Sequence, residues 1–166
     1  DGSMLLSRQF LSVSLWDVQS GQLLLEKDTI WEAAALSPDG QILATGFGRL
    51  TSLIDLWDVE TGQSLGQLEA PLAVDRLEWA ADSRTLFGRF TDWALISEGF
   101  VYTGLALRAW DMVSGQEIAT FEFTSEKMLP ITLTPDETLI GVPYDDDYSH
   151  VLIWNQQTGD VYNSKF

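Results

Sequence analysis

The sequence predicts an all-β chain of four repeated units, each a four-stranded antiparallel sheet, with the innermost strand of the first unit missing. Two recurring signals carry this prediction. A tryptophan followed at once by Asp or Asn, and five residues later by glycine, occurs four times. Turn sequences of the Ser-Pro-Asp-Gly type precede it. Such self-similarity is the signature of repeat architectures.

The tryptophan frame predicts a hairpin. Apolar residues stand one and three positions before each tryptophan, and in three of the four copies a polar residue separates them, which is the period-two pattern of a strand. Asp or Asn and then Ser/Thr-Gly favour a turn, because these side chains cap turns and glycine accepts positive φ. A second strand follows, with Leu24, Leu65, Ile118 and Tyr162 at equivalent positions. The frame residues, which we expect to be structural, are Trp16, Asp17, Gly21, Trp57, Asp58, Gly62, Trp110, Asp111, Gly115, Trp154, Asn155 and Gly159.

The upstream turn sequences complete each unit. Residues 37–40 and 134–137 place proline at the first corner of a turn, residues 81–83 are a degenerate copy, and Asp1 fits the same frame. Each full unit therefore consists of four strands, called a, b, c and d in chain order. We expect about fifteen strands and almost no helix in a single segment, residues 1–166, with repeats at approximately 1–26, 27–69, 70–123 and 124–166. Because Asp1 aligns with the turn after strand a, the first unit lacks that strand.

Two fragments make the repeat specific. "LSPDGQILATG" and "LIDLWDVETGQSLGQLEA" resemble the WD-repeat family, and the resemblance extends from Asp1 to about Tyr162 in degenerate copies similar to bacterial members. It implies a β-propeller, a ring of four-stranded blades around a channel. The family's usual role is a rigid scaffold for protein partners. A related propeller, such as the quinoprotein-like fold, is the alternative.

The sequence departs from the family at one hydrogen-bond network. Many members carry a Gly-His pair before strand a, whose histidine bonds a serine of strand b and supports the tryptophan of strand c. This chain has a single histidine, His150, at the start of a strand c, so that network cannot form in the same way. The position of the strand-b hydroxyl holds Ser7 and Thr45 in two repeats, and Gly88 and Val142 in the others.

The repeats differ mainly between strands b and c. The third carries about ten extra residues there, within residues 90–104, and the resemblance implies that b–c and d–a loops open on one face of the ring. Insertions on one face of a repeat array often mark the binding face. Trp93, Phe100 and Tyr102 are of types that anchor protein interfaces, so we expect them to bind a partner. Alternatively, they cover the blade or extend strands b and c as a longer hairpin.

The fourth repeat has an acidic loop at the equivalent place. Its candidate binding residues, which suit a basic partner, are Tyr144, Asp145, Asp146, Asp147 and Tyr148. Adjacent carboxylates could also help to hold calcium, which takes six to eight oxygen ligands. No calcium-loop spacing is recognisable around them, so we expect a solvated acidic turn and no metal.

Composition excludes several classes of partner. The net charge is −16, which disfavours binding to nucleic acid and to anionic membranes, favours solubility, and could steer a basic protein. No apolar run is long enough to cross a bilayer. With no cysteine, the chain has no disulfide, thiol nucleophile or thiolate metal ligand. This leaves the compartment open, and we expect a soluble protein of the cytoplasm.

Catalytic signals are weak. A Ser-His-acid hydrolase would have to use His150, and no Gly-x-Ser-x-Gly elbow is present. Carboxylates are abundant, but none stands out at the end of an apolar strand. We therefore expect no enzyme and no cofactor, but a scaffold that binds protein partners. The alternative is a structural or sensory module of a larger multidomain protein, such as a bacterial signalling protein. We also expect that the remainder of a larger propeller, or a second copy, closes the ring.

Overall fold

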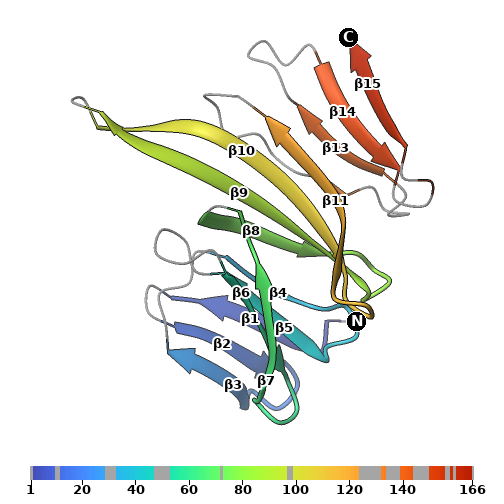
Figure 1. Cartoon of the computed structure of the whole chain (residues 1–166). Helices are drawn as coiled ribbons and strands as arrows, with labels where there is room; N and C mark the ends of the chain where they lie inside the picture. The colour runs from blue at the N-terminus through green and yellow to red at the C-terminus, as the bar shows by residue number, and fades with distance from the viewer. Residues whose placement is uncertain are drawn as a thin grey trace.

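Fifteen strands form four antiparallel sheets in the described part of the chain, which contains no helix (Figure 1). The structure is a computed structural model. It describes residues 2–9, 12–28, 33–46, 53–71, 73–96, 99–123, 132–133, 139–143, 150–155, 158 and 160–165. The number of strands agrees with the expected fifteen.

Each sheet is built from strands that follow one another in the chain. The first, with three strands, comprises β1 (Met4–Arg8), β2 (Ser12–Asp17) and β3 (Leu23–Asp28). The second comprises β4 (Ala33–Leu36), β5 (Ile42–Gly46), β6 (Leu53–Asp58) and β7 (Ser64–Glu69). The third comprises β8 (Ala73–Trp79), β9 (Thr85–Ile96), β10 (Gly99–Asp111) and β11 (Gln116–Phe123). The fourth comprises β12 (Thr132–Leu133), β13 (Leu139–Pro143), β14 (His150–Asn155) and β15 (Val161–Lys165).

The turn after each tryptophan strand has one hydrogen bond in common, from a backbone N–H to the Oδ1 atom of its Asp or Asn. In the second sheet, the Oδ1 atom of Asp58 accepts from the backbone N–H and the hydroxyl of Thr61, both at 2.7 Å. The Gly62 N–H donates to the Asp58 carbonyl at 2.9 Å, and Gly62 has φ +69°, which favours glycine. Asn155 accepts from the Thr158 N–H at 3.1 Å through its own Oδ1, so this turn requires an acceptor oxygen rather than a charge.

A β-bulge follows in the outermost strand of the first three sheets. Trp16 pairs with Leu23 while Leu15 pairs with Leu25, so that Leu24 is the extra residue. The same shift in register makes Leu65 the extra residue in the second sheet and Ile118 the extra residue in the third. All three extra residues are exposed. The recurrence shows that the repeated sequence frame corresponds to a repeated backbone geometry.

Apolar side chains pack between neighbouring sheets. Leu43 and Val59 of the second sheet join Val13, Leu15 and Leu25 of the first in one buried cluster. The opposite side of the second sheet packs on the third in a larger cluster. Its members are Ala33, Ala44, Ile54, Leu56, Leu68, Ala70, Val74, Leu77, Trp79, Leu86, Phe90, Ala106 and Trp110. The core is therefore distributed as layers between sheets.

The repeat tryptophans stabilise their own sheets. The Trp57 Nε1–H donates to the Thr45 hydroxyl at 2.8 Å, and the Trp16 Nε1–H donates to the Ser7 hydroxyl at 3.0 Å. The tryptophan–hydroxyl bond thus forms without a histidine. In the third sheet Gly88 replaces the hydroxyl, and the ring of Phe90 lies edge-on to Trp110 with centroids 5.7 Å apart. A Cβ atom on Gly88 would lie 2.6 Å from Phe90, so glycine is what admits this aromatic pair.

Candidate interaction surfaces

The third sheet carries a two-stranded ribbon that extends beyond its neighbours. β9 pairs with β8 only as far as Thr91, and β10 pairs with β11 only from Leu105 onward. Beyond those positions β9 and β10 pair with each other alone, to the end at Ile96 and Gly99. Figure 1 shows this ribbon extending well past β8 and β11. The insertion of the third repeat therefore extends strands b and c as a longer hairpin.

The ribbon places the predicted aromatic residues opposite one another. Trp93 pairs in register with Tyr102, and Leu95 pairs with Phe100. Because residues alternate between the two faces of a strand, all four positions lie on one face of the ribbon. The backbone register thus places the three candidate positions of the third repeat near one another on the two paired strands.

The base of the ribbon is bent and anchored. Thr103 is an extra residue between Tyr102 and Gly104 in the register of β10 with β9, and such bulges bend a strand. Asp75 is a similar extra residue in β8, and its Oδ1 accepts from the Arg89 Nε–H at 2.8 Å. Both side chains are nearly buried, with 14% and 9% exposed. This ion pair joins the innermost strand to β9 two residues before the ribbon leaves the sheet.

The acidic loop of the fourth repeat, residues 144–148, lies outside the described residues, and so does Gly159. The predictions for its tyrosines and aspartates, and the calcium alternative, therefore remain predictions. In the described ranges no group of three or more His, Cys, Asp or Glu side chains could hold a metal ion. In the same ranges there is no helix long and apolar enough to cross a membrane.

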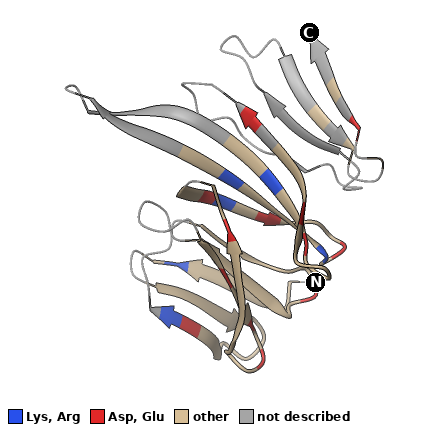
Figure 2. Cartoon of the chain, viewed as in Figure 1, with Lys and Arg blue, Asp and Glu red and all other residues tan. Residues whose placement is uncertain are grey.

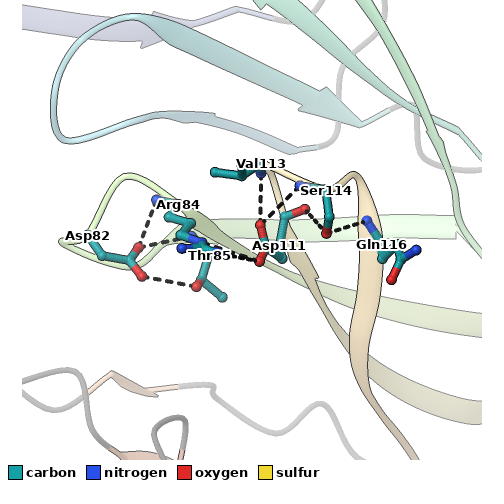
Figure 3. Close-up of polar contacts among 7 residues, drawn as sticks. All are labelled: Asp82, Arg84, Thr85, Asp111, Val113, Ser114 and Gln116. Atoms are coloured by element: carbon teal, nitrogen blue, oxygen red, sulfur yellow. Dashed lines mark hydrogen bonds and ion pairs between the residues drawn. The ribbon is translucent and has the colours of Figure 1, made fainter.

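The turns at the opposite end of the strands form a second, acidic surface. Figure 2 shows acidic residues on several strands and also in turns at this end. In the third sheet, Asp82 accepts from the backbone N–H groups of Arg84 and Thr85 at 2.8 and 2.9 Å (Figure 3). The Arg84 side chain crosses to Asp111, with its Nη2 atom 2.6 Å from the carboxylate. The two turns of this sheet are thereby joined.

Hydrogen bonding and charge keep the turn aspartates ionised. The Arg84 guanidinium, together with the N–H groups of Val113 and Ser114, lowers the pKa of Asp111 to about 2. The Thr61 hydroxyl and N–H lower the pKa of Asp58 below its ordinary value, and Ser20 does the same for Asp17. These three turns therefore carry full negative charge at neutral pH.

A groove lies between the first two sheets at this same end. It has a volume of about 560 Å³, and it is lined by Met4, Leu24, Gly40, Gln41, Asp58, Val59 and Glu60. Met4 packs against the turn at Gly40, where a Cβ atom would approach its methyl group to 3.0 Å. The lining of the groove combines apolar residues with two acidic ones.

Comparison with known proteins identifies the fold that these four sheets form. No protein-family model and no curated protein sequence matches the chain. Many solved structures have a similar fold; one of them, the structure of U3-55K, a WD40 protein, superposes with a TM-score of 0.67 at 18% identity over 97% of this chain. The fold is a β-propeller. The four sheets are its blades, and the predicted all-β class is confirmed; among the described residues the first blade has three strands and each of the others has four. The chain spans 48% of the length of U3-55K.

Three features of these surfaces escaped prediction from sequence. Arg84 lies 27 residues from Asp111, and nothing in the local sequence indicates their pairing. The Asp75–Arg89 pair depends on a bulge that has no sequence signal. The groove is formed by residues of two repeats. Aligning the turns does place Gln41 at the position of Arg84, and that difference in charge was the available signal.

Proposed function

We propose that this propeller is a non-catalytic scaffold that binds a protein partner through the β9–β10 ribbon. The observation that carries the proposal is the register of Trp93 with Tyr102 and of Leu95 with Phe100 on one ribbon face. Aromatic residues are enriched in the residues that dominate binding energy at interfaces. Such a ribbon also leaves backbone N–H and C=O groups along both edges, to which a further strand can add.

The structure supports a rigid base for such a ribbon. The third blade packs on the second through a buried cluster, and Asp75–Arg89 anchors the strand from which the ribbon emerges. A rigid base reduces the entropy that is lost on binding. The proposed partner is a protein, and the acidity of the chain favours one with basic residues near its binding site.

Site-specific photo-crosslinking tests this proposal. A benzoylphenylalanine at position 102 should form a crosslink to a partner in cell extract that the same group at position 113 does not form. Val113 is the matched control, because it is 77% exposed in a turn at the other end of the strands. Trp93→Ala and Tyr102→Ala should abolish the crosslink formed from position 100, with the melting temperature nearly unchanged. Equal loss of stability and of crosslinking would instead favour a packing role for these residues.

We further propose that an additional strand completes the first blade beside β1. The support is that β1 pairs with β2 on one edge, while no described strand pairs with its other edge. The strand would come from the remainder of a larger propeller or from a second copy of this chain. Light scattering, with amide exchange at residues 4–7, tests this. A stable monomer with protected amides there would contradict it.

A further inference from the structure

The groove between the first two blades lies at the opposite end of the strands from the ribbon, and its lining has a distinct chemistry. Met4, Val59 and Leu24, which is 42% exposed, are the apolar residues of its lining. Asp58 and Glu60, from a single turn, add two carboxylates to the lining. A volume of about 560 Å³ lies within the range of about 300–1,000 Å³ typical of ligand pockets.

The third blade shows which side chain suits this geometry. Its turns have the same hydrogen bond between them as those of the second blade. The Val59 N–H donates to the Gln41 carbonyl at 2.9 Å in the second blade, and the Met112 N–H donates to the Arg84 carbonyl at 2.8 Å in the third. Gln41 therefore corresponds to Arg84, and Asp58 corresponds to Asp111. In the third blade a guanidinium pairs with the turn carboxylate. In the second blade Gln41 stands at the equivalent position, and no residue lining the groove carries a guanidinium.

The charges around the groove favour a cation from outside. None of its seven lining residues is basic. Lys27, a cation on the seam between these blades, is engaged elsewhere: its ammonium donates to the Gly62 carbonyl at 2.7 Å and lies 4.0 Å from the centroid of the Trp57 ring. Arginine suits the site better than lysine, because its planar guanidinium can make two parallel hydrogen bonds to a carboxylate and its stem packs on apolar surface.

We propose that this groove binds an arginine side chain of a protein partner, with its stem over Met4 and Val59 and its guanidinium on Asp58. The bound side chain would take, in the second blade, the place that Arg84 takes in the third. Leucine or a similar residue next to the arginine would cover Leu24. The site is separate from the ribbon and does not depend on the role proposed for the ribbon.

A peptide titration tests this assignment. The probe is acetyl-Gly-Leu-Arg-Leu-Gly-amide, added to the ¹⁵N-labelled chain at low ionic strength, and the reference is the same peptide with neutral citrulline in place of arginine. We expect saturable shifts of the Gln41, Val59 and Glu60 amides, and binding at least tenfold weaker for the citrulline peptide. Equal affinity for both peptides, or no saturable shift, would overturn the proposal.

Three variants locate the site. Asp58→Asn should weaken binding at least fivefold while retaining the turn, because Asn155 closes the equivalent turn. Gln41→Arg should weaken binding similarly, because it supplies the guanidinium from within the chain. Asp17→Asn removes the same charge from the equivalent turn outside the groove, and it should change the affinity less than twofold. Equal effects of Asp58→Asn and Asp17→Asn would show non-specific attraction and overturn the assignment.

Discussion

Arg84 donates two hydrogen bonds to one oxygen of the Asp111 carboxylate, from Nε at 3.2 Å and from Nη2 at 2.6 Å. The bonds join the turn between β8 and β9 to the turn between β10 and β11. Of these four strands, β9 and β10 continue into the ribbon. The pair therefore fixes the near end of the hairpin whose far part carries Trp93 and Tyr102. The second blade has Gln41 in place of Arg84, which provides a natural reference for substitution.

Arg84→Gln should raise the pKa of Asp111 from about 2 toward 3.8, and the Val113 N–H should keep the pKa somewhat below that value. Because the folded-state pKa is depressed, the stabilisation is complete above the unfolded-state pKa, near 4, and is lost as the pH falls toward 2. The variant should therefore be less stable than the parent at pH 7, with a difference that shrinks between pH 4 and pH 2. Carboxyl ¹³C titration and urea unfolding measure the two effects. An unchanged pKa would mean that the ion pair does not form in solution.

Thr45→Val should destabilise the second blade by about 1–3 kcal/mol, because it removes the acceptor of the Trp57 Nε1–H while keeping the side-chain shape. Thr45 is fully buried, so water cannot replace the hydroxyl. Thr45→Ser, which keeps the hydroxyl, is the control and should cost less. Urea denaturation gives the free energies of unfolding. Equal stability of Thr45→Val and the parent would show that the hydrogen bond contributes nothing.

Gly46→Ala should weaken the packing between the second and third blades and so lower the free energy of unfolding. An alanine Cβ atom would lie 2.5 Å from Cγ1 and 2.7 Å from Cβ of Val74, on the neighbouring blade. We expect a loss of about 1–3 kcal/mol, as for other overpacked cores. The cost should be smaller when Val74→Ala is already present, because the methyl groups are then gone. Strict additivity of the two substitutions in thermal unfolding would contradict this contact.

Two substitutions of Ser83 should distinguish the effect of backbone strain on stability from the effect of the hydrogen bond. Ser83 has φ +52°, where the equivalent residues Gly2 and Gly40 are glycine, and its hydroxyl accepts from the Asp39 N–H at 3.0 Å. Ser83→Ala loses the acceptor and retains the strain, whereas Ser83→Gly loses the acceptor but relieves the strain. Ser83→Gly should therefore be the more stable of the two, by about 1 kcal/mol in thermal unfolding. The reverse order would mean that the left-handed backbone costs little here.

The blades were predictable because their signals are local. A strand of period two, an Asp or Asn acceptor and a glycine at positive φ lie within a few residues, so one window of sequence determines the Trp57–Gly62 hairpin. The relations between residues distant in the sequence were not predictable. The approach of Gly46 to Val74, the stacking of Lys27 on Trp57 and the pairing of Arg84 with Asp111 join residues about thirty positions apart.

The insertion of the third repeat was predictable in place, and a longer hairpin of strands b and c was one of the two forms expected for it. The structure extends the two strands in register and sets Trp93 opposite Tyr102. An irregular loop and a paired ribbon can have the same amino-acid composition. Which of the two forms depends on side-chain pairs between the two strands, and neither strand specifies these pairs alone. The Trp57 side chain is half-buried on the seam with the first blade.

The bulge in the outer strands also affects how the protein behaves at high concentration. β3, β7 and β11 each form the outside edge of a sheet, where straight, apolar strands can stack edge to edge into growing fibrils. The extra residue in each, Leu24, Leu65 or Ile118, twists the strand and breaks the row of evenly spaced donors and acceptors that such growth needs. One extra residue in the outer strand of each of these three blades thus makes the edge a poorer template for amyloid-like assembly, while the aliphatic side chains stay in contact with solvent.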